Sequence, residues 1–379
     1  MEFKAPRGTS DHLPELKSNW NKIEIIARET ARSFGYNEIT TPVFEQTSLF
    51  KRAVGEGTDV VTKEMYNLTD LGGNEFTLRP EGTAPVCRAF VEHGMHNLPY
   101  PLRLFYIEPM FRHERPQSGR MRQHHQFGVE IFGDNSPEAD AEIILVGLTY
   151  LKKLGIKNLK LRLNSIGNKN SREKFRKEFL DYFSTMKNDL PEIDKKKFDL
   201  NPIRILDSKE KITMDLILKS PKPIEFLDDE SKKHWDKLQI IINKIIDQFN
   251  DVDLVIDHNL VRGLDYYSMT VFEIEPASRS EKSQASILSG GRYDNLISHI
   301  GGPDTPAAGF GSGIERIMIS MDESFFEVDD LPNLTIISLT NEAWVKTNTL
   351  ANTVREKNIV VVNSSANKSF KSQMRYAND

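Results

Sequence analysis

The stretch FRHERPQSGRMRQHHQFGVEIFG, residues 111–133, contains the strongest fold signal of the chain. Its centre, residues 116–119 (PQSG), is typical of a turn. Apolar residues alternate with polar ones on both sides of this turn, at Leu102, Leu104 and Tyr106 before it and at Phe127, Val129 and Ile131 after it. Such alternation is typical of strands that bury one face. The sequence therefore predicts two antiparallel strands joined by a basic loop.

The predicted loop is unusually rich in arginine. Four guanidiniums and two carboxylates fall in or near it: Arg112, Arg115, Arg120, Arg122, Glu114 and Glu130. A guanidinium presents a planar fork of donors that matches the oxygens of a phosphate group. The hairpin is therefore predicted to grip a polyphosphate. A solvated surface hairpin with salt bridges is the alternative, and composition alone does not separate the two.

Length and composition limit the remaining possibilities. A chain of 379 residues has room for two or three domains with their own cores. Its formal charge of −5 gives no global basic field, so nucleic-acid binding would depend on local basic patches. The single cysteine, Cys87, has no disulfide partner and fits a small core residue in a reducing cytosol. We find no apolar stretch near the ~18–20 residues of a membrane span and no secretory signal, which predicts a cytoplasmic protein.

The pattern along the chain predicts four parts. Residues 1–167 mix an amphipathic helix (18–34), a strand (38–46), a hairpin (64–80) and a long helix that opens at Ser136-Pro137-Glu138. Residues 168–250 are charged and helical in period, with phenylalanines and a later isoleucine-rich face, and are predicted to be a helical insertion. Strand patterns return over 251–328. After a linker at 329–332, residues 331–379 are predicted to form a strand–helix–strand α/β unit.

Four further segments have residue types that suit a ligand site. TLRPEGT (77–83) places a carboxylate and a hydroxyl at a turn, where they suit an ammonium group, although an ordinary acidic turn has the same composition. LVRGLDYY (260–267) sets an arginine beside two tyrosines, which suits an anionic group held in a ring-walled pocket. SGGRYD (289–294) pairs glycines that admit a close approach of the backbone. GFGSGIER (309–316) is a glycine-rich strand end that enters a helix near Ile314, and it matches neither the Walker nor the GxGxxG pattern.

No metal site is predicted. The nine histidines are scattered, and the neighbours His124 and His125 would point to opposite faces of a strand. The C-x₂-C and H-E-x-x-H spacings do not occur in the sequence.

Together these segments resemble the class II aminoacyl-tRNA synthetases. The basic hairpin is similar to their second signature and GFGSGIER to their third, while the wording of FRHERP, RQHHQFGVEIFG and LVRGLDYY is similar to the histidyl-tRNA synthetase family. The resemblance covers residue 6 to about residue 379. It implies an α+β fold with an antiparallel sheet flanked by helices, in which 1–167 and 251–328 form the catalytic domain, 168–250 the helical insertion and 331–379 a truncated α/β anticodon-binding domain.

The resemblance also implies roles for individual residues. Arg112 and Arg262 would be catalytic, neutralising charge at the α-phosphate of ATP. The ATP-binding set would be Arg112, Arg120, His124 and Arg316, with His124 at a position that in the family is often a phenylalanine stacked on the adenine. The histidine-binding set would be Glu81, Gly82, Thr83, Gln126, Glu130, Arg262, Tyr266, Tyr267 and Tyr293. Within this set Glu81, Thr83 and Gln126 would take the α-ammonium group, and Glu130, Tyr267 and Tyr293 would bind the imidazole.

The expected reaction is ATP-dependent charging of tRNA(His) with histidine by a homodimer, with ATP as substrate and Mg²⁺ brought by ATP rather than held at a dedicated protein site. A DNA partner and a membrane partner are not expected. One alternative is the synthetase-like regulatory subunit of ATP phosphoribosyltransferase, a binding module without ligase activity. Another is a synthetase-like sensor domain that binds uncharged tRNA. Because only about 49 residues remain from Leu331 onward, we also expect a natural chain that continues further, and a 379-residue chain that activates histidine but charges tRNA poorly.

Overall fold

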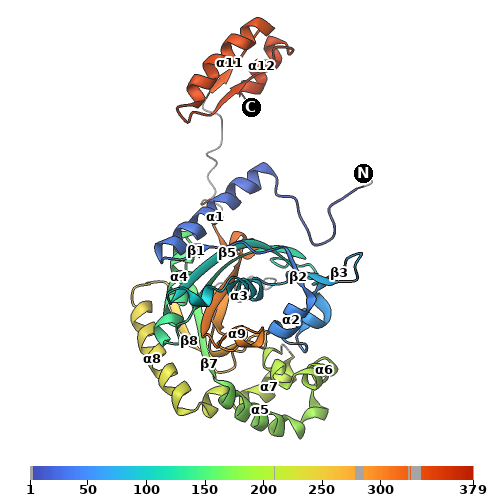
Figure 1. Ribbon diagram of the computed structural model, residues 1–379, viewed down its shortest axis with the longest axis vertical. Helices are drawn as coiled ribbons and strands as arrows, with labels where there is room; N and C mark the ends of the chain where they lie inside the picture. The colour runs from blue at the N-terminus through green and yellow to red at the C-terminus, as the bar shows by residue number, and fades with distance from the viewer. Residues whose placement is uncertain (1–2, 209, 278–285, 323–324, 326–333, 379) are drawn as a thin grey trace. The chain divides into compact units, whose positions relative to one another are not determined.

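The computed structural model describes residues 3–208, 210–277, 286–322, 325 and 334–378, and the chain forms two compact units, Met1–Phe325 and Phe326–Asp379 (Figure 1). The predicted linker at 329–332 lies outside the described residues. The first unit is built on an eight-stranded sheet, and the second unit is a small α/β element.

The eight strands of the main sheet run in the spatial order β1-β5-β6-β11-β10-β9-β7-β8. Their bounds are Asn37–Glu38 (β1), Leu102–Phe111 (β5), Gln123–Phe132 (β6), Ala307–Gly313 (β11), Leu288–Arg292 (β10), Ser268–Pro276 (β9), Leu159–Gly167 (β7) and Val252–Ile256 (β8). The five inner pairings are antiparallel, but β1 pairs with β5 and β7 with β8 in parallel. The expectation of an antiparallel sheet is therefore wrong at both edges. Each parallel pair is joined by a long crossover, as parallel strands require.

The hairpin predicted from residues 102–133 is confirmed. Strands β5 and β6 are ten residues each and pair antiparallel, with Leu104 opposite Glu130 and Met110 opposite His124. The basic loop connects them, as the turn residues predicted. Because β6 also pairs with β11 and β5 with β1, both strands of this hairpin lie inside the sheet rather than at its edge.

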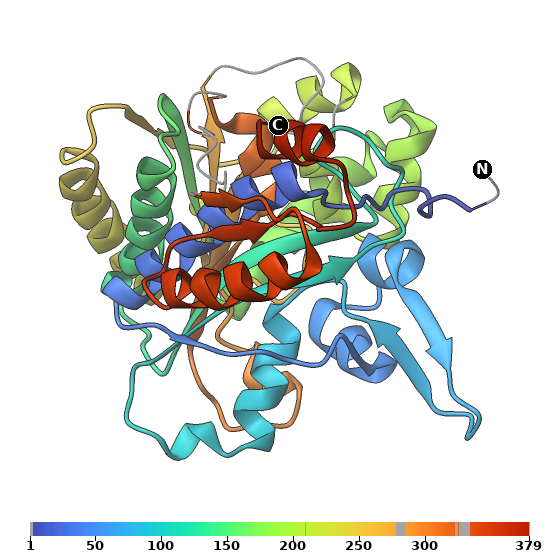
Figure 2. The same cartoon turned by 90° about the horizontal axis from the view of Figure 1, so that it is seen from above.

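Three long helices pack against one face of the sheet: α1 (Pro14–Ser33), α4 (Pro137–Lys153) and α8 (Asp229–Ile246). Figure 2 shows α4 and α8 lying side by side. Helix α4 begins where the sequence predicted, because Ser136 Oγ accepts a hydrogen bond from the Ala139 amide (3.3 Å) and Pro137 occupies the first turn. Helix α1 begins four residues earlier than predicted, with Pro14 in its first turn.

The other side carries a second core and a small sheet. This sheet has the order β2-β4-β3, with the bounds Phe44–Gln46 (β2), Tyr66–Thr69 (β3) and Glu75–Leu78 (β4). The helical elements beside it are α2 (Thr47–Val54), η1 (Val60–Glu64), α3 (Thr83–Glu92), η2 (Met95–Asn97) and α9 (Leu296–His299). The hairpin β3–β4 and the burial of Cys87 are as predicted. The single strand predicted at 38–46 is instead split into β1 and β2, with Pro42 between them.

Residues 168–250 are helical, as predicted, but they do not share one core. The elements α5 (Lys169–Ser184), η3 (Lys187–Asp189), α6 (Glu192–Leu200), η4 (Pro202–Asp207), α7 (Lys211–Lys219) and η5 (Pro223–Phe226) enclose an aromatic cluster that includes Phe175, Phe179 and Phe183. Helix α8 packs on α4, β7, β8 and β9 instead. The apolar face of α8, which includes Leu238 and Ile242, therefore belongs to the helical layer of the sheet rather than to the aromatic cluster.

The second unit has the predicted strand–helix–strand order. Its elements are β12 (Leu334–Ile336), α11 (Asn341–Arg355), β13 (Val361–Asn363) and α12 (Phe370–Asn378), and the two strands pair in parallel. Buried Gln373 joins the strand ends, since its Nε2 donates to Ser338 O after β12 (3.0 Å) and its Oε1 accepts from the hydroxyl of Ser364 after β13.

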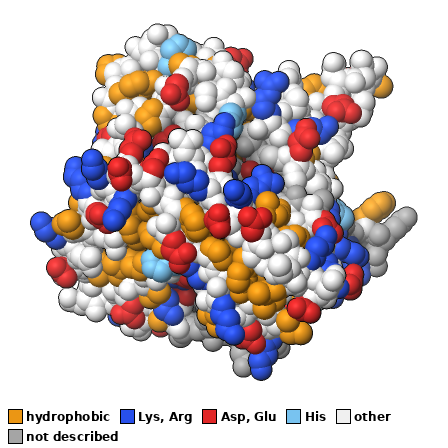
Figure 3. Space-filling view, turned by 90° about the horizontal axis from the view of Figure 1, so that it is seen from below, with side chains coloured by type: hydrophobic (Ala, Val, Ile, Leu, Met, Phe, Trp, Pro, Cys, Tyr) orange, Lys and Arg blue, Asp and Glu red, His pale blue; other side chains and the backbone are white. Residues whose placement is uncertain are grey.

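Among the described residues, the structure contains no helix with both the length and the apolar character to cross a membrane. Acidic and basic side chains are interspersed on the face drawn in Figure 3, as the small net charge predicts.

Candidate active site

One cavity of about 1280 Å³ gathers segments that are far apart in the sequence. Its lining comes from the β5–β6 hairpin, β9, β11, the start of α3 and the loop 257–267. Eleven of the thirteen predicted site residues line it: Glu81, Thr83, Arg112, Arg120, His124, Gln126, Arg262, Tyr266, Tyr267, Tyr293 and Arg316. The other two, Gly82 and Glu130, lie behind this surface.

The acidic turn at the start of α3 is well ordered by its own hydrogen bonds. The Glu81 carboxylate accepts from the amides of Thr83 and Ala84, each at 2.8 Å, and so caps the helix N-terminus. The side chain is 3% exposed, and burial raises the pKa of its carboxyl despite these bonds. One end of the cavity therefore presents an acid beside a hydroxyl, as the TLRPEGT segment predicted.

Glu130 is the most deeply buried acid of the site. It is fully buried, and its carboxylate accepts hydrogen bonds from the hydroxyls of Tyr293, Thr83 (2.9 Å) and, weakly, Tyr106 (3.4 Å). Burial raises the pKa of Glu130 to about 8, although these hydroxyls oppose the shift. Because Glu130 does not reach the cavity surface, a ligand would sense it through the hydroxyls of Thr83 and Tyr293.

Two glycines of β11 make room for the pocket side chains of β6. Gly309 lies opposite Glu130, and Gly311 lies opposite Gly128, next to the side chain of Gln126. A Cβ at Gly309 would come within 1.9 Å of Glu130 Oε2, and one at Gly311 within 1.6 Å of Gln126 Nε2. The glycine-rich segment 309–313 is therefore required at least in part by side chains of the protein itself.

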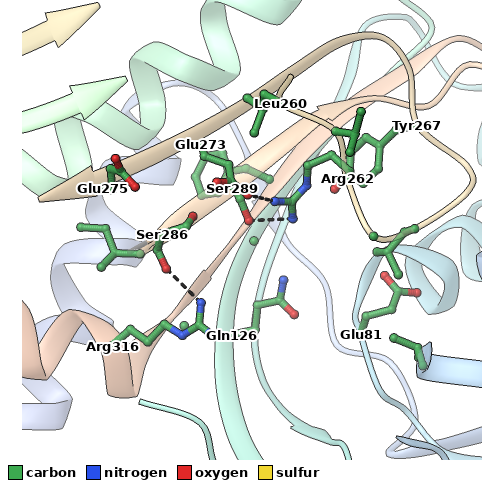
Figure 4. Close-up of a pocket in the computed structure, with 18 of the residues that line it drawn as sticks. Glu81, Gln126, Leu260, Arg262, Tyr267, Glu273, Glu275, Ser286, Ser289 and Arg316 are labelled. Carbon is green, nitrogen blue, oxygen red and sulfur yellow. Dashed lines mark hydrogen bonds and ion pairs between the residues drawn. The ribbon is translucent and has the colours of Figure 1, made fainter. Parts of the chain in front are cut away.

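Arg262 is fixed in the cavity wall by partners that the sequence analysis did not assign. Its guanidinium forms an ion pair with Glu273 on β9 and donates to Ser289 Oγ on β10 (2.8 Å), as Figure 4 shows. It also lies over the ring of Tyr267, 5.6 Å from the centroid. Among the described residues, its buried Nε has no hydrogen-bond acceptor. The partners Glu273 and Ser289 hold the guanidinium at the cavity wall.

The three tyrosines form one aromatic wall next to Arg262. The ring centroids of Tyr266 and Tyr267 lie 4.7 Å apart, and those of Tyr266 and Tyr293 lie 5.6 Å apart. All three side chains are largely buried. This wall bounds the end of the cavity at Thr83, and Glu130 lies behind the wall.

The hairpin supplies two cavity arginines rather than four. Arg112 donates from Nε to Pro80 O (2.7 Å), and Arg120 pairs with Glu114 at 3.0 Å. Arg115 and Arg122 do not line the cavity. The prediction of a four-arginine grip is therefore wrong, and for Arg122 the reason is visible: its Nε donates to Glu114 O (3.2 Å) and closes the base of the loop.

Arg316 supplies a third cation on this side of the cavity. It lies in the first turn of α10 (Ile314–Ser320), directly after β11, where GFGSGIER predicted a helix start. Its guanidinium donates to Gly119 O (3.1 Å) and to Ser286 O (2.9 Å), the second of which is drawn in Figure 4. Burial and the neighbours Arg120 and Arg112 lower the pKa of Arg316.

His124 lines the cavity. An unperturbed imidazole titrates near pH ~6.5. Burial, together with Arg112 and Arg316, moves the pKa of His124 well below that value. The ring is therefore neutral at physiological pH. His125 points elsewhere and pairs with Glu315 (3.1 Å), as expected for adjacent residues of a strand.

A network beside Arg262, whose members Arg162, Asp257 and Glu273 also line the cavity, was not predicted from the sequence. Glu273 also pairs with Arg162 on β7 (3.3 Å), and Arg162 pairs with Asp257. The available signal was the alternation of acids in VFEIE and of basic residues in KLRL, but it does not say which residues meet. In the described residues, no three His, Cys, Asp or Glu side chains gather in a way that could hold a metal ion.

The arrangement combines two chemistries in one cavity. Arg112, Arg120, Arg262 and Arg316 present cations, and the Glu81–Thr83 turn with the tyrosine wall presents an acid and hydroxyls. A polyanion fits the first part, and a small molecule with an ammonium group fits the second.

Comparison with known proteins identifies the relatives of the chain. The family profile described as histidyl-tRNA synthetase matches residues 8–168 and 219–317. A histidine–tRNA ligase of Caldanaerobacter subterraneus subsp. tengcongensis is 42% identical over 380 residues, covering 100% of this chain and 89% of the relative. One of Streptococcus pneumoniae is 38% identical, with coverage of 100% and 87%. Apo histidyl-tRNA synthetase of S. aureus superposes with a TM-score of 0.80 at 32% identity, covering 99% of this chain and 88% of that structure.

Proposed function

This chain belongs to the histidyl-tRNA synthetase family, and we propose that its cavity activates histidine with ATP and transfers the histidyl group to the 3′ end of tRNA(His). Relatives named histidine–tRNA ligase, 38% to 44% identical over the whole chain, support a ligase. The observation that carries the proposal is the position of Arg262. It comes from the histidine-specific segment LVRGLDYY and lines the same cavity as the hairpin arginines and Arg316.

The first step joins histidine to the α-phosphorus of ATP. A carboxylate oxygen of histidine attacks this phosphorus in line, the bond to the β-bridging oxygen breaks, and pyrophosphate leaves. Such a transfer depends mainly on positioning and on stabilising negative charge. We assign charge stabilisation at the α-phosphate to Arg112 and Arg262, whose partners Pro80, Ser289 and Glu273 hold them in place.

ATP would lie along the cationic wall. Arg120 and Arg316 would bind the outer phosphates, and the neutral ring of His124 would stack on the adenine. ATP would bring its own Mg²⁺. Because no group of three acidic, histidine or cysteine side chains that could hold a metal is found among the described residues, we assign no step to the ion.

Histidine would lie along the acidic and aromatic wall. Glu81, Thr83 and Gln126 would bind the α-ammonium group, beside Gly82. Tyr266, Tyr267 and Tyr293 would enclose the imidazole, and Glu130 would act on it through the hydroxyls of Tyr293 and Thr83. Buried polar groups of this kind select a substrate strongly, because an analogue that lacks the matching group leaves them unpaired.

In the second step a ribose hydroxyl at the 3′ end of tRNA attacks the carbonyl carbon of the adenylate, and AMP leaves. We propose that the unit Phe326–Asp379 takes part in anticodon binding, that residues 168–250 act as an insertion, and that the chain works as a cytoplasmic homodimer. One other solved structure, described as an ATP phosphoribosyltransferase regulatory subunit/histidyl-tRNA synthetase from Bacillus halodurans, shares the fold (TM-score 0.71) at 23% identity, and it does not indicate which activity the chain has.

The test is ATP–pyrophosphate exchange with a panel of amino acids. We expect exchange that depends on histidine, together with histidine acceptance by tRNA. A folded chain that binds histidine but supports no exchange would be a binding module, and the ligase proposal would be wrong.

A further inference from the structure

The N-terminal stretch Pro6–Thr9 contacts the base of the basic hairpin loop. Gly8 O accepts a hydrogen bond from the Arg122 amide (2.7 Å) and a longer one from the Gln123 amide (3.3 Å). In Figure 2 this stretch, in dark blue, passes beside the hairpin before it enters α1. A turn gives it shape, because both the amide and the hydroxyl of Thr9 donate to Pro6 O (3.0 and 2.8 Å).

Arg122 connects this stretch to the cavity without lining the cavity itself. On its other side, Arg122 O accepts from the Arg112 amide (2.8 Å). Its Nε donates to Glu114 O (3.2 Å), and the Glu114 carboxylate pairs with Arg120 at 3.0 Å. The backbone of Arg122 therefore connects Gly8 to Arg112. The side chain of Arg122 connects Gly8 to Arg120 through Glu114.

From these contacts we propose that Pro6–Thr9 is a positioning element for the ATP-binding arginines and that it acts through Arg122. The proposal rests on the proposed function, since it takes Arg112 and Arg120 as ligands of ATP. It also explains why Arg122, which has the residue type of a phosphate ligand, faces away from the cavity. Among the described residues, Pro6–Thr9 forms no hydrogen bond or ion pair with the proposed histidine-binding residues.

Gly8 is the residue that permits the contact. Its φ of +85° lies in the left-handed region, and a Cβ there would meet Arg122 Cγ at 2.7 Å and Arg122 Cβ at 3.0 Å. Gly35 provides a matched control. It has a φ of +80°, but a Cβ there would meet nothing within 4 Å. Alanine at either position costs backbone strain, and only alanine at Gly8 pushes against Arg122.

The experiment measures the KM for ATP and the KM for histidine in pyrophosphate exchange for the parent, Gly8→Ala and Gly35→Ala. Misplacing a catalytic group by about 1 Å can cost 10²-fold, so we expect Gly8→Ala to raise the KM for ATP on the order of tenfold. The KM for histidine should stay within about twofold, and Gly35→Ala should resemble the parent. Equal rises in both KM values, or no rise, would overturn the proposal.

A double-mutant cycle with Arg122→Ala tests the route. If the effect of Gly8→Ala passes through the Arg122 side chain, it should shrink in the Arg122→Ala background, whereas additive effects would contradict the route. If Gly8→Ala fails to fold, Thr9→Val tests the proposal instead. This substitution removes only the hydrogen bond from the Thr9 hydroxyl to Pro6 O. A folded Thr9→Val with an unchanged KM for ATP would overturn the proposal, and a selective rise would support it.

Calorimetric titration with ATP and Mg²⁺ separates this inference from the proposed function. If the parent protein shows no histidine-dependent exchange, the ligase proposal is refuted. The affinities of Gly8→Ala and Gly35→Ala for ATP would still test the positioning element. Equal affinity in the two variants would overturn it.

Discussion

Replacing Glu130 by glutamine should change how the stability of the protein depends on pH. Glu130 is fully buried, and burial raises its pKa from 4.5 to about 8. Below pH 4.5 the carboxyl is protonated in both the folded and the unfolded chain. Between pH 4.5 and about 8 the unfolded chain releases the proton and the folded chain keeps it. The unfolded state is favoured by this difference, so the free energy of unfolding falls as the pH rises.

The size of the effect follows from the interval between the two pKa values. Each unit corresponds to ~1.36 kcal/mol, so the parent loses about 5 kcal/mol of stability to this one group between pH 4.5 and pH 8. Glutamine carries no titrating proton. The free energy of unfolding of Glu130→Gln, relative to the parent, should therefore rise by about the same amount over this range and level off above it.

Urea denaturation of both proteins at intervals from pH 4.5 to pH 9 measures this difference, since the other titrating groups are shared and cancel. Glu138→Gln is the control. Its carboxyl has a lowered pKa because Lys237 donates to it, so that variant should show no trend above pH 4.5. A Glu130→Gln difference that stays constant from pH 4.5 to pH 9 would refute the buried, protonated acid.

Three other substitutions test separate parts of the site and fold. Arg262→Ala should slow single-turnover adenylation on the order of 10²-fold or more, because it removes a charge that stabilises the transferring phosphoryl group; near-normal adenylation would remove Arg262 from the catalytic set. His124→Phe should leave the pH profile of the KM for ATP unchanged between about pH 5.5 and 7.5, since the pKa of His124 lies well below its ordinary value; a flattened profile would show that the ring titrates there. Asp140→Ala leaves buried Arg292 without its main partner, and urea denaturation should show a loss of about 3–5 kcal/mol. A loss under about 1 kcal/mol would contradict the pairing.

The parts of the fold that were predictable depend on short-range patterns. Alternation on both sides of residues 116–119 gave β5 and β6, and the Ser-Pro-Glu start at 136–138 gave the first turn of α4. Both signals act over a few residues, so the sequence alone contains them. The parallel edge pairings are different, because β7 and β8 are separated in the sequence by the whole helical segment between Gly167 and Val252.

The sequence predicted which residues line the cavity, but not how their side chains are arranged. Motif resemblance named most of the residues that line the cavity, yet it could not say that Glu130 stands behind Tyr293 or that Arg122 turns outward. Such details depend on partners distant in the sequence. Arg122 is held by Gly8, and Arg162 reaches Arg262 only through Glu273 of another strand.

Paired acids hold the cavity arginines in place in a chain with a net charge of −5. Glu114 neutralises Arg120, and Glu273 neutralises Arg262, so the arginines are held close together before any anion arrives. Each acid is also bound from behind, Glu114 through its backbone carbonyl by Arg122 and Glu273 through its carboxylate by Arg162. An arriving phosphate would therefore find donors already oriented, and the cost of orienting them was met during folding. If the cavity binds ATP as proposed, Arg122, which lies outside the cavity lining, and Arg162, which belongs to it, would contribute through the acids that they hold in place.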